Sequence, residues 1–83
     1  MADRTSQKIK TVIAKECGIP RELITNKTRF MSNTDFSYFE CMGALYTLQH
    51  KFHVYLPESD YYKYSTVGSL TRCIINQLKS RAK

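Results

Sequence analysis

Apolar residues recur at helical spacing near the start of the chain, over residues 5–17. Ile9, Val12, Ile13 and Cys17 fall at positions i, i+3, i+4 and i+8, so they share one face of a helix. Gly18 follows directly, and glycine commonly ends a helix because it adopts the left-handed backbone at little cost. The segment from Pro20 to Ile24 then favours a single helical turn with proline at its first position.

A second helix is predicted over residues 37–51. Ser37 and Glu40 form a Ser-x-x-Glu capping box, which stabilises a helix start by about 1 kcal/mol. Gly43 would cost this helix roughly 1 kcal/mol relative to alanine unless another group packs closely against it. We expect the core-facing stripe to contain Phe39, Met42, Leu45, Leu48 and Phe52, widened by Tyr38, Cys41 and Tyr46.

Between these helices, residues 25–37 form a polar run rich in turn-forming side chains. Phe30, Met31 and Phe36 are the apolar points within it, and we expect them to hold the loop against the core. A loop of this length is unusual in so small a domain, which suggests that it has a role of its own.

The rest of the chain predicts an extended connection over residues 53–57, a short helix over 58–63 and a last helix capped by Ser65 or Thr66. The sequence therefore indicates an all-α bundle of three longer helices plus one or two short ones. We expect one domain over residues 1–83, with its core from about residue 5 to 79 and with flexible ends. The apolar positions of the last helix are Val67, Leu70, Cys73, Ile74 and Leu78.

Composition narrows the class of protein. The 83 residues are enough for one small core, and no apolar run approaches the roughly 20 residues of a membrane span. The first eight residues are polar and charged, unlike a secretory signal. The three cysteines include no Cys-x-x-Cys pair, so we expect small buried thiols in a reducing, cytoplasmic compartment and no metal site.

The net charge of +6, with a pI near 9.4, favours anionic partners. A basic adaptor that binds nucleic acid or an anionic surface therefore remains one hypothesis, although no nucleic-acid motif accompanies the charge. His50 and His53 have no carboxylate or cysteine partner at catalytic spacing, and there is no nucleophile–base pair. We therefore expect a protein without enzymatic activity.

The order of short motifs along the chain resembles the acyl carrier protein family. The matching motifs span roughly residues 8 to 78 without a gap, and they are Gly18-Ile19, Ile24-Thr25-Asn26, Phe30, Phe52, Leu56-Pro57 and Ser65-Thr66-Val67. The resemblance implies the carrier fold. It also implies an attachment point for phosphopantetheine, which this family carries on the serine of an Asp-Ser-Leu motif at the start of the second long helix.

At that motif this chain reads Ser37-Tyr38-Phe39. Tyr38 aligns with the modified serine, and its phenolic oxygen lies farther from the backbone than a serine hydroxyl, so we expect no attachment there and no bound cofactor. Ser37 aligns with the family's aspartate and can keep the capping role. A shift of one residue would instead make Ser37 the attachment site, and the chain would then be a divergent functional carrier with 4'-phosphopantetheine on Ser37.

The charge of the second long helix also departs from the family, whose members present an acidic helix to basic patches on their enzymes. Between residues 37 and 51 the only acid is Glu40. The chain has therefore either changed partners or docks through a different surface. We expect a monomeric, non-catalytic interaction module whose partner is a protein, such as an enzyme or complex of fatty acid or polyketide-type biosynthesis. The expected contact residues are Phe36, Tyr38, Phe39, Met42, Tyr61 and Tyr62.

Overall fold

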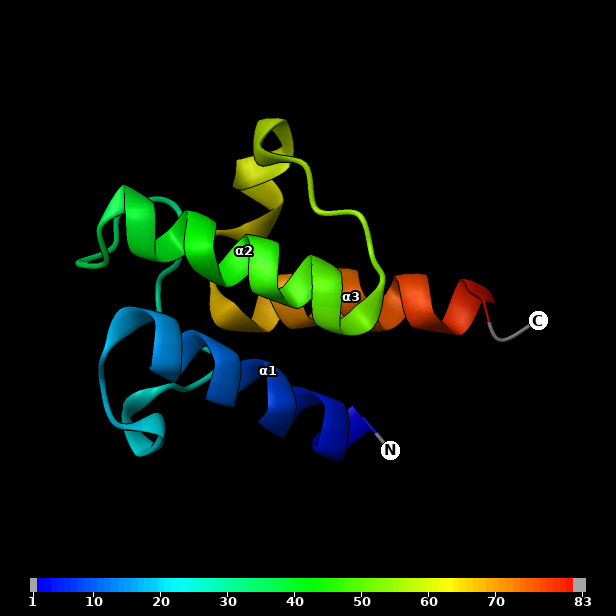
Figure 1. Ribbon diagram of the computed structural model, residues 1–83, viewed down its shortest axis with the longest axis horizontal. Coiled ribbons are helices and arrows are strands. Elements are labelled where there is room, and N and C mark those ends of the chain that lie inside the picture. Colours follow the sequence, from blue (N-terminus) through cyan, green and yellow to red (C-terminus); the bar gives the residue numbers. More distant parts are fainter. Residues whose placement is uncertain (1, 82–83) are drawn as a thin grey trace.

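The computed structural model describes the backbone of residues 2–81, which form three α-helices and two short 3-10 helices. In Figure 1, α1 and α2 run side by side, α3 lies behind α2, and η2 stands at the far side of α2 from α1. α1 packs against both α2 and α3, and η2 packs against α3. The predicted all-α class is confirmed over the described residues. The elements are α1 (Ala2–Cys17), η1 (Arg21–Leu23), α2 (Tyr38–Phe52), η2 (Glu58–Tyr64) and α3 (Val67–Arg81).

The first helix is longer than the sequence pattern indicated. α1 begins at Ala2 rather than at residue 5, and α3 ends at Arg81. The flexible ends were expected at about residues 1–4 and 80–83; residues 2–4 and 80–81 are helical, and residues 1 and 82–83 lie outside the described residues. Gly18 ends α1 as expected, because its φ of 69° is the left-handed conformation that glycine adopts readily.

The core is built from all three long helices and from the loop before α2. Its fully buried large side chains are Ile9 and Ile13 of α1, Leu45 and Leu48 of α2, Val67, Leu70 and Ile74 of α3, Phe30 of the loop, Leu56 of the connection after α2 and Tyr64 of η2. Met31 and Phe36 pack partly buried against this core, which confirms that the loop is anchored by its apolar residues. Cys17 and Cys41 are buried as expected, whereas Cys73 is only partly buried.

The predicted core stripe of α2 is confirmed at Cys41, Leu45 and Leu48 but was wrong for three of its four aromatic members. Phe39, Tyr46 and Tyr38 are 85%, 62% and 58% exposed, while Met42 and Phe52 are partly buried. The residues of α2 that are buried are Cys41, Ala44, Leu45 and Leu48, at positions i, i+3, i+4 and i+7. Small side chains at two of these positions let α1 approach closely. The rings of Tyr38, Phe39 and Tyr46 are consequently left on the outer faces.

Two sets of hydrogen bonds hold the segments before and after α2 against α3. At its start, the amides of Val67 and Gly68 donate to the carbonyls of Thr28 and Asn26, at 2.9 Å each. A Cβ on Gly68 would lie 3.0 Å from that Asn26 oxygen, so glycine permits the close approach. The long loop is thereby tied to the same helix that closes the bundle.

At the other end of α3, side chains hold the connection between α2 and η2. The Gln77 amide accepts from the Tyr55 N–H at 2.9 Å and donates to the Tyr55 carbonyl at 2.7 Å. Arg81 donates to the carbonyls of Phe52 and His53, at 2.6 Å each. The connection itself alternates as predicted, because Tyr55 is 72% exposed between buried neighbours on either side.

Candidate functional site

The start of α2 carries the residues that sequence comparison singled out, and Ser37 caps this helix. Its Oγ accepts from the Glu40 N–H at 3.1 Å, and Glu40 Oε1 accepts from the Ser37 N–H at 2.8 Å. The predicted capping box is therefore confirmed. Because Ser37 occupies the cap, Tyr38 becomes the first residue of α2 and projects toward solvent.

Tyr38 makes a contact that no local pattern predicted. Its hydroxyl donates to Glu58 Oε2 at 2.7 Å, across 20 residues of sequence, and this hydrogen bond links the first turn of α2 to the first turn of η2. The hydrogen bond to Glu58 raises the pKa of Tyr38, because a deprotonated phenol can no longer donate to the carboxylate. In the sequence, Glu58 could be identified only as an acid in the first turn of a short helix, a position that stabilises the start of a helix.

An open cavity of about 460 Å³ lies beside this hydrogen bond, lined by Met31, Tyr38, Glu58, Ser59 and Tyr61. Its walls come from the loop, α2 and η2, three segments that are separate in the sequence. It has the volume of a small-ligand pocket but is shallow and open to solvent, a shape that suits the insertion of a partner side chain. The structure thus brings Tyr38 and Tyr61 to one place.

The six predicted contact residues divide into two groups. Tyr38 and Phe39 pair edge to face with ring centroids 6.0 Å apart, and Tyr61 and Tyr62 do so at 6.2 Å. All four of these rings are exposed, whereas Phe36 and Met42 are partly buried against the core. Phe36 and Met42 therefore support the surface more than they form it.

Tyr64 does not join the exposed tyrosines, although the sequence places it beside them. Its ring is 2% exposed and its hydroxyl donates to the Pro57 carbonyl at 3.2 Å. Burial raises the pKa of Tyr64 to about 12. This side chain therefore anchors η2 to the core and takes no part in a contact surface.

The cysteines are poorly suited to nucleophilic chemistry. Burial raises the pKa of Cys17 to about 12, and burial also raises the pKa values of Cys41 and Cys73. These thiols are consequently protonated at neutral pH, and the thiolate is the reactive form. His50 and His53, by contrast, are exposed.

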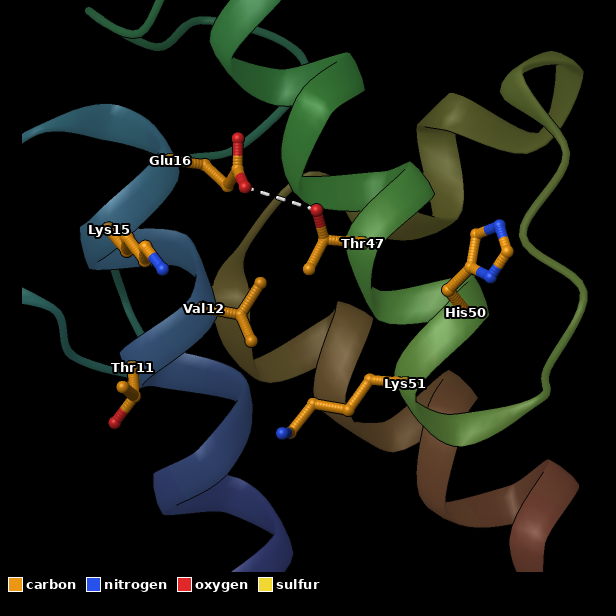
Figure 2. Close-up of a pocket in the computed structure, with 7 residues that line it drawn as sticks. All are labelled: Thr11, Val12, Lys15, Glu16, Thr47, His50 and Lys51. Carbon is orange, nitrogen blue, oxygen red and sulfur yellow. Dashed lines mark hydrogen bonds between the residues drawn. The ribbon is translucent and has the colours of Figure 1, made fainter.

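A second open cavity, of about 480 Å³, lies between α1 and α2 (Figure 2). Thr11, Val12, Lys15 and Glu16 line it from α1, and Thr47, His50 and Lys51 line it from α2. We call it the α1–α2 groove. Its lysines are far apart in sequence, so only the packing of the two helices reveals it.

Glu16 at one end of the groove explains the glycine inside α2. The Thr47 hydroxyl donates to Glu16 Oε2 at 3.1 Å, and a Cβ on Gly43 would lie 2.8 Å from Glu16 Oε1. Close packing against Gly43, which the sequence required but did not identify, is therefore supplied by the Glu16 carboxylate. Alanine at this position would displace the end of the Glu16 side chain.

Two further properties bear on function. No three His, Cys, Asp or Glu side chains within the described part of the chain gather closely enough to hold a metal ion. Over residues 2–81, every helix is too short or too polar to cross a membrane.

No model of a known protein family matches the chain.

Proposed function

We propose that this chain is an acyl carrier protein-like domain that carries no phosphopantetheine and acts as a non-catalytic protein-interaction module. The observation that carries the proposal is the first turn of α2, where Ser37 is the helix cap and Tyr38 is the first helical residue. In the motif resemblance, Tyr38 aligns with the family's modified serine. The cap and the attachment residue are adjacent in this motif. The chain keeps a capping residue, Ser37, and has Tyr38 in place of the attachment serine.

The chemistry of Tyr38 supports the loss of attachment. A transferase must bring a serine oxygen, close to the backbone, into line with the phosphate of coenzyme A. The Tyr38 oxygen lies at the far end of a ring and is held 2.7 Å from the Glu58 carboxylate. That carboxylate would also repel an incoming phosphate.

The surface around Tyr38 supports a role in protein contacts. Tyr38, Phe39, Tyr61 and Tyr62 are all more than half exposed. Exposed tyrosines are frequent anchors of protein interfaces, because each ring buries a large area at low entropic cost. The partner we propose is an enzyme or complex of fatty acid or polyketide-type biosynthesis.

Intact mass after incubation with coenzyme A and a broad-specificity phosphopantetheinyl transferase tests the proposal. The wild-type chain should show no added mass. The variant Ser37→Asp/Tyr38→Ser/Phe39→Leu, which restores the family's Asp-Ser-Leu motif and keeps a good helix cap, should gain the arm. If the wild-type chain gains mass, the proposal is wrong, and if the restored motif stays unmodified, the resemblance to carriers loses its support.

The alternative is a divergent carrier modified on Ser37, and one observation favours it: the Ser37 side chain is exposed at the helix start. This hypothesis predicts a mass gain in the wild-type chain that disappears in Ser37→Asp. Aspartate preserves the cap, so the loss of modification would not come from a frayed helix.

A further inference from the structure

We propose that the α1–α2 groove binds an acidic segment of a partner protein. The segment would place an apolar side chain over Val12 and its carboxylates near Lys15 and Lys51. This inference concerns a different surface from the one around Tyr38 and does not depend on the proposed function. Thr47 and Tyr38 are nine positions apart on α2, which at about 100° per residue puts them on opposite sides of the helix.

The shape of the groove suits a peptide segment. Two helices form its walls, and Figure 2 shows Val12 pointing from α1 toward α2 while Lys51 extends across the space toward α1. The aliphatic stems of lysine side chains add apolar surface around such a floor and leave the ammonium groups at the rim. An apolar anchor with charged flanks is complementary to this arrangement.

The charges in the groove favour an anionic occupant. Among the described side chains, no carboxylate lies within ion-pair distance of Lys15 or Lys51. The carboxylate in the groove, Glu16, is hydrogen-bonded to Thr47 and packed over Gly43. Lys8 lies two turns before Lys15 on the same side of α1 and continues the positive surface. The overall charge of +6 would steer an acidic partner toward it.

The same features favour a protein segment over a nucleic acid. The groove has no Tyr, Phe, Trp or Arg among its lining residues, so it offers no guanidinium for phosphate, and its one ring for base stacking is the imidazole of His50. Glu16 would also repel a continuous phosphate backbone. A peptide can place neutral groups beside Glu16 and carboxylates beside the lysines.

Titration of the ¹⁵N-labelled full chain, followed by NMR, tests the inference. The probe is a short peptide with blocked ends that contains glutamate and leucine at helical spacing. Amide shifts should change around Val12, Lys15 and Lys51. The variant Lys15→Glu/Lys51→Glu should bind the probe about tenfold more weakly. The control Lys27→Glu/Lys79→Glu makes the same change in net charge at exposed lysines outside the groove, and it should bind nearly as well as the wild type.

Several outcomes separate the possibilities. The NMR spectrum of each variant reports whether it is folded, and the milder Lys15→Gln/Lys51→Gln should weaken binding in the same direction. Shifts that map elsewhere, or equal losses in the two charge-reversed variants, would overturn the proposal. A single-stranded oligonucleotide that binds the groove more tightly than the acidic peptide would also overturn it and assign the site to nucleic acid. Because the mass experiment tests Tyr38 and Ser37 alone, either proposal can fail while the other stands.

Discussion

At the first turn of α2, two adjacent residues have separable roles. Ser37 satisfies the amide of Glu40, and this role depends only on a short oxygen-bearing side chain at the cap. Tyr38 follows it with a side chain that reaches Glu58 on another element. Because the cap does not require a particular residue at the next position, the helix start can be retained while the chemistry of that position changes completely.

The hydrogen bond between Tyr38 and Glu58 predicts a pH dependence. In Glu58→Gln an acceptor remains but its charge is lost, so the pKa of Tyr38 should fall toward its ordinary value of about 10. The pKa is raised in the folded chain, so the stabilisation from this bond is present below the ordinary pKa and is lost as the pH rises through the raised value. An NMR titration of the chain labelled at the tyrosine Cζ atoms measures the pKa of Tyr38 in both proteins.

The control for that titration is Glu22→Gln, which removes an exposed acid from the first turn of the other 3-10 helix. It should leave the Tyr38 titration unchanged. If the Tyr38 pKa in Glu58→Gln equals that of the wild type, the contact does not persist in solution.

At the scale of elements, α2 shows how an apolar pattern can give the right helix and too wide a buried face. Cys41, Leu45 and Leu48 of the expected stripe are buried, together with Ala44, whereas the rings of Tyr38, Phe39 and Tyr46 are exposed. Phe39 precedes Cys41 by two positions, or about 200° around the helix. A sequence pattern does not distinguish a ring that packs in the core from one that stays exposed on the surface.

Two truncations test which face of α2 is buried. Leu48→Ala removes a side chain with no exposed surface, so it should lower the free energy of unfolding by about 2–5 kcal/mol. Phe39→Ala removes a ring that is 85% exposed and should change it by less than about 0.5 kcal/mol. Urea denaturation followed by circular dichroism measures both. A loss of several kcal/mol in Phe39→Ala would contradict the orientation of α2 described above.

The sequence predicts features that depend on local signals and does not predict features that depend on tertiary packing. Capping and stop residues are local signals, so the cap of α2 at Ser37 and the stop after α1 at Gly18 were predictable. The bond between Tyr38 and Glu58 depends on how η2 sits against α2, and the groove between Lys15 and Lys51 depends on how α1 packs. Both depend on tertiary packing, which the spacing of residues along the sequence does not predict.

At the scale of the whole molecule, a small core makes polar tethers important. A domain of this size buries a limited fraction of its apolar surface, so hydrogen bonds that fix its connections are a larger share of its stability. α3 supplies them at both ends. Its start binds the loop before α2, and its last turns bind the connection after α2. Both surfaces discussed above include α2, whose two flanking connections are held by α3.

This role of α3 predicts the effect of Gln77→Ala. The substitution removes two hydrogen bonds to the Tyr55 backbone, so it should lower the free energy of unfolding by about 1–2 kcal/mol. In a domain of this size the melting temperature should fall by roughly 4–8 °C for each kcal/mol. The matched control is Asn76→Ala, at an exposed neighbouring position, where alanine should be neutral or slightly stabilising because of its higher helix propensity.

Hydrogen exchange gives the local measurement that a melting temperature cannot. The Tyr55 N–H is held by Gln77 Oε1, so its exchange should accelerate in Gln77→Ala. The amide of Val67, which donates to Thr28 at the opposite end of α3, should change only as much as global stability does. Equal acceleration at both sites would mean that Gln77 contributes to the stability of the whole domain without specifically holding the connection. Faster exchange at Tyr55 alone would show that the last turns of α3 hold this segment against the end of α2.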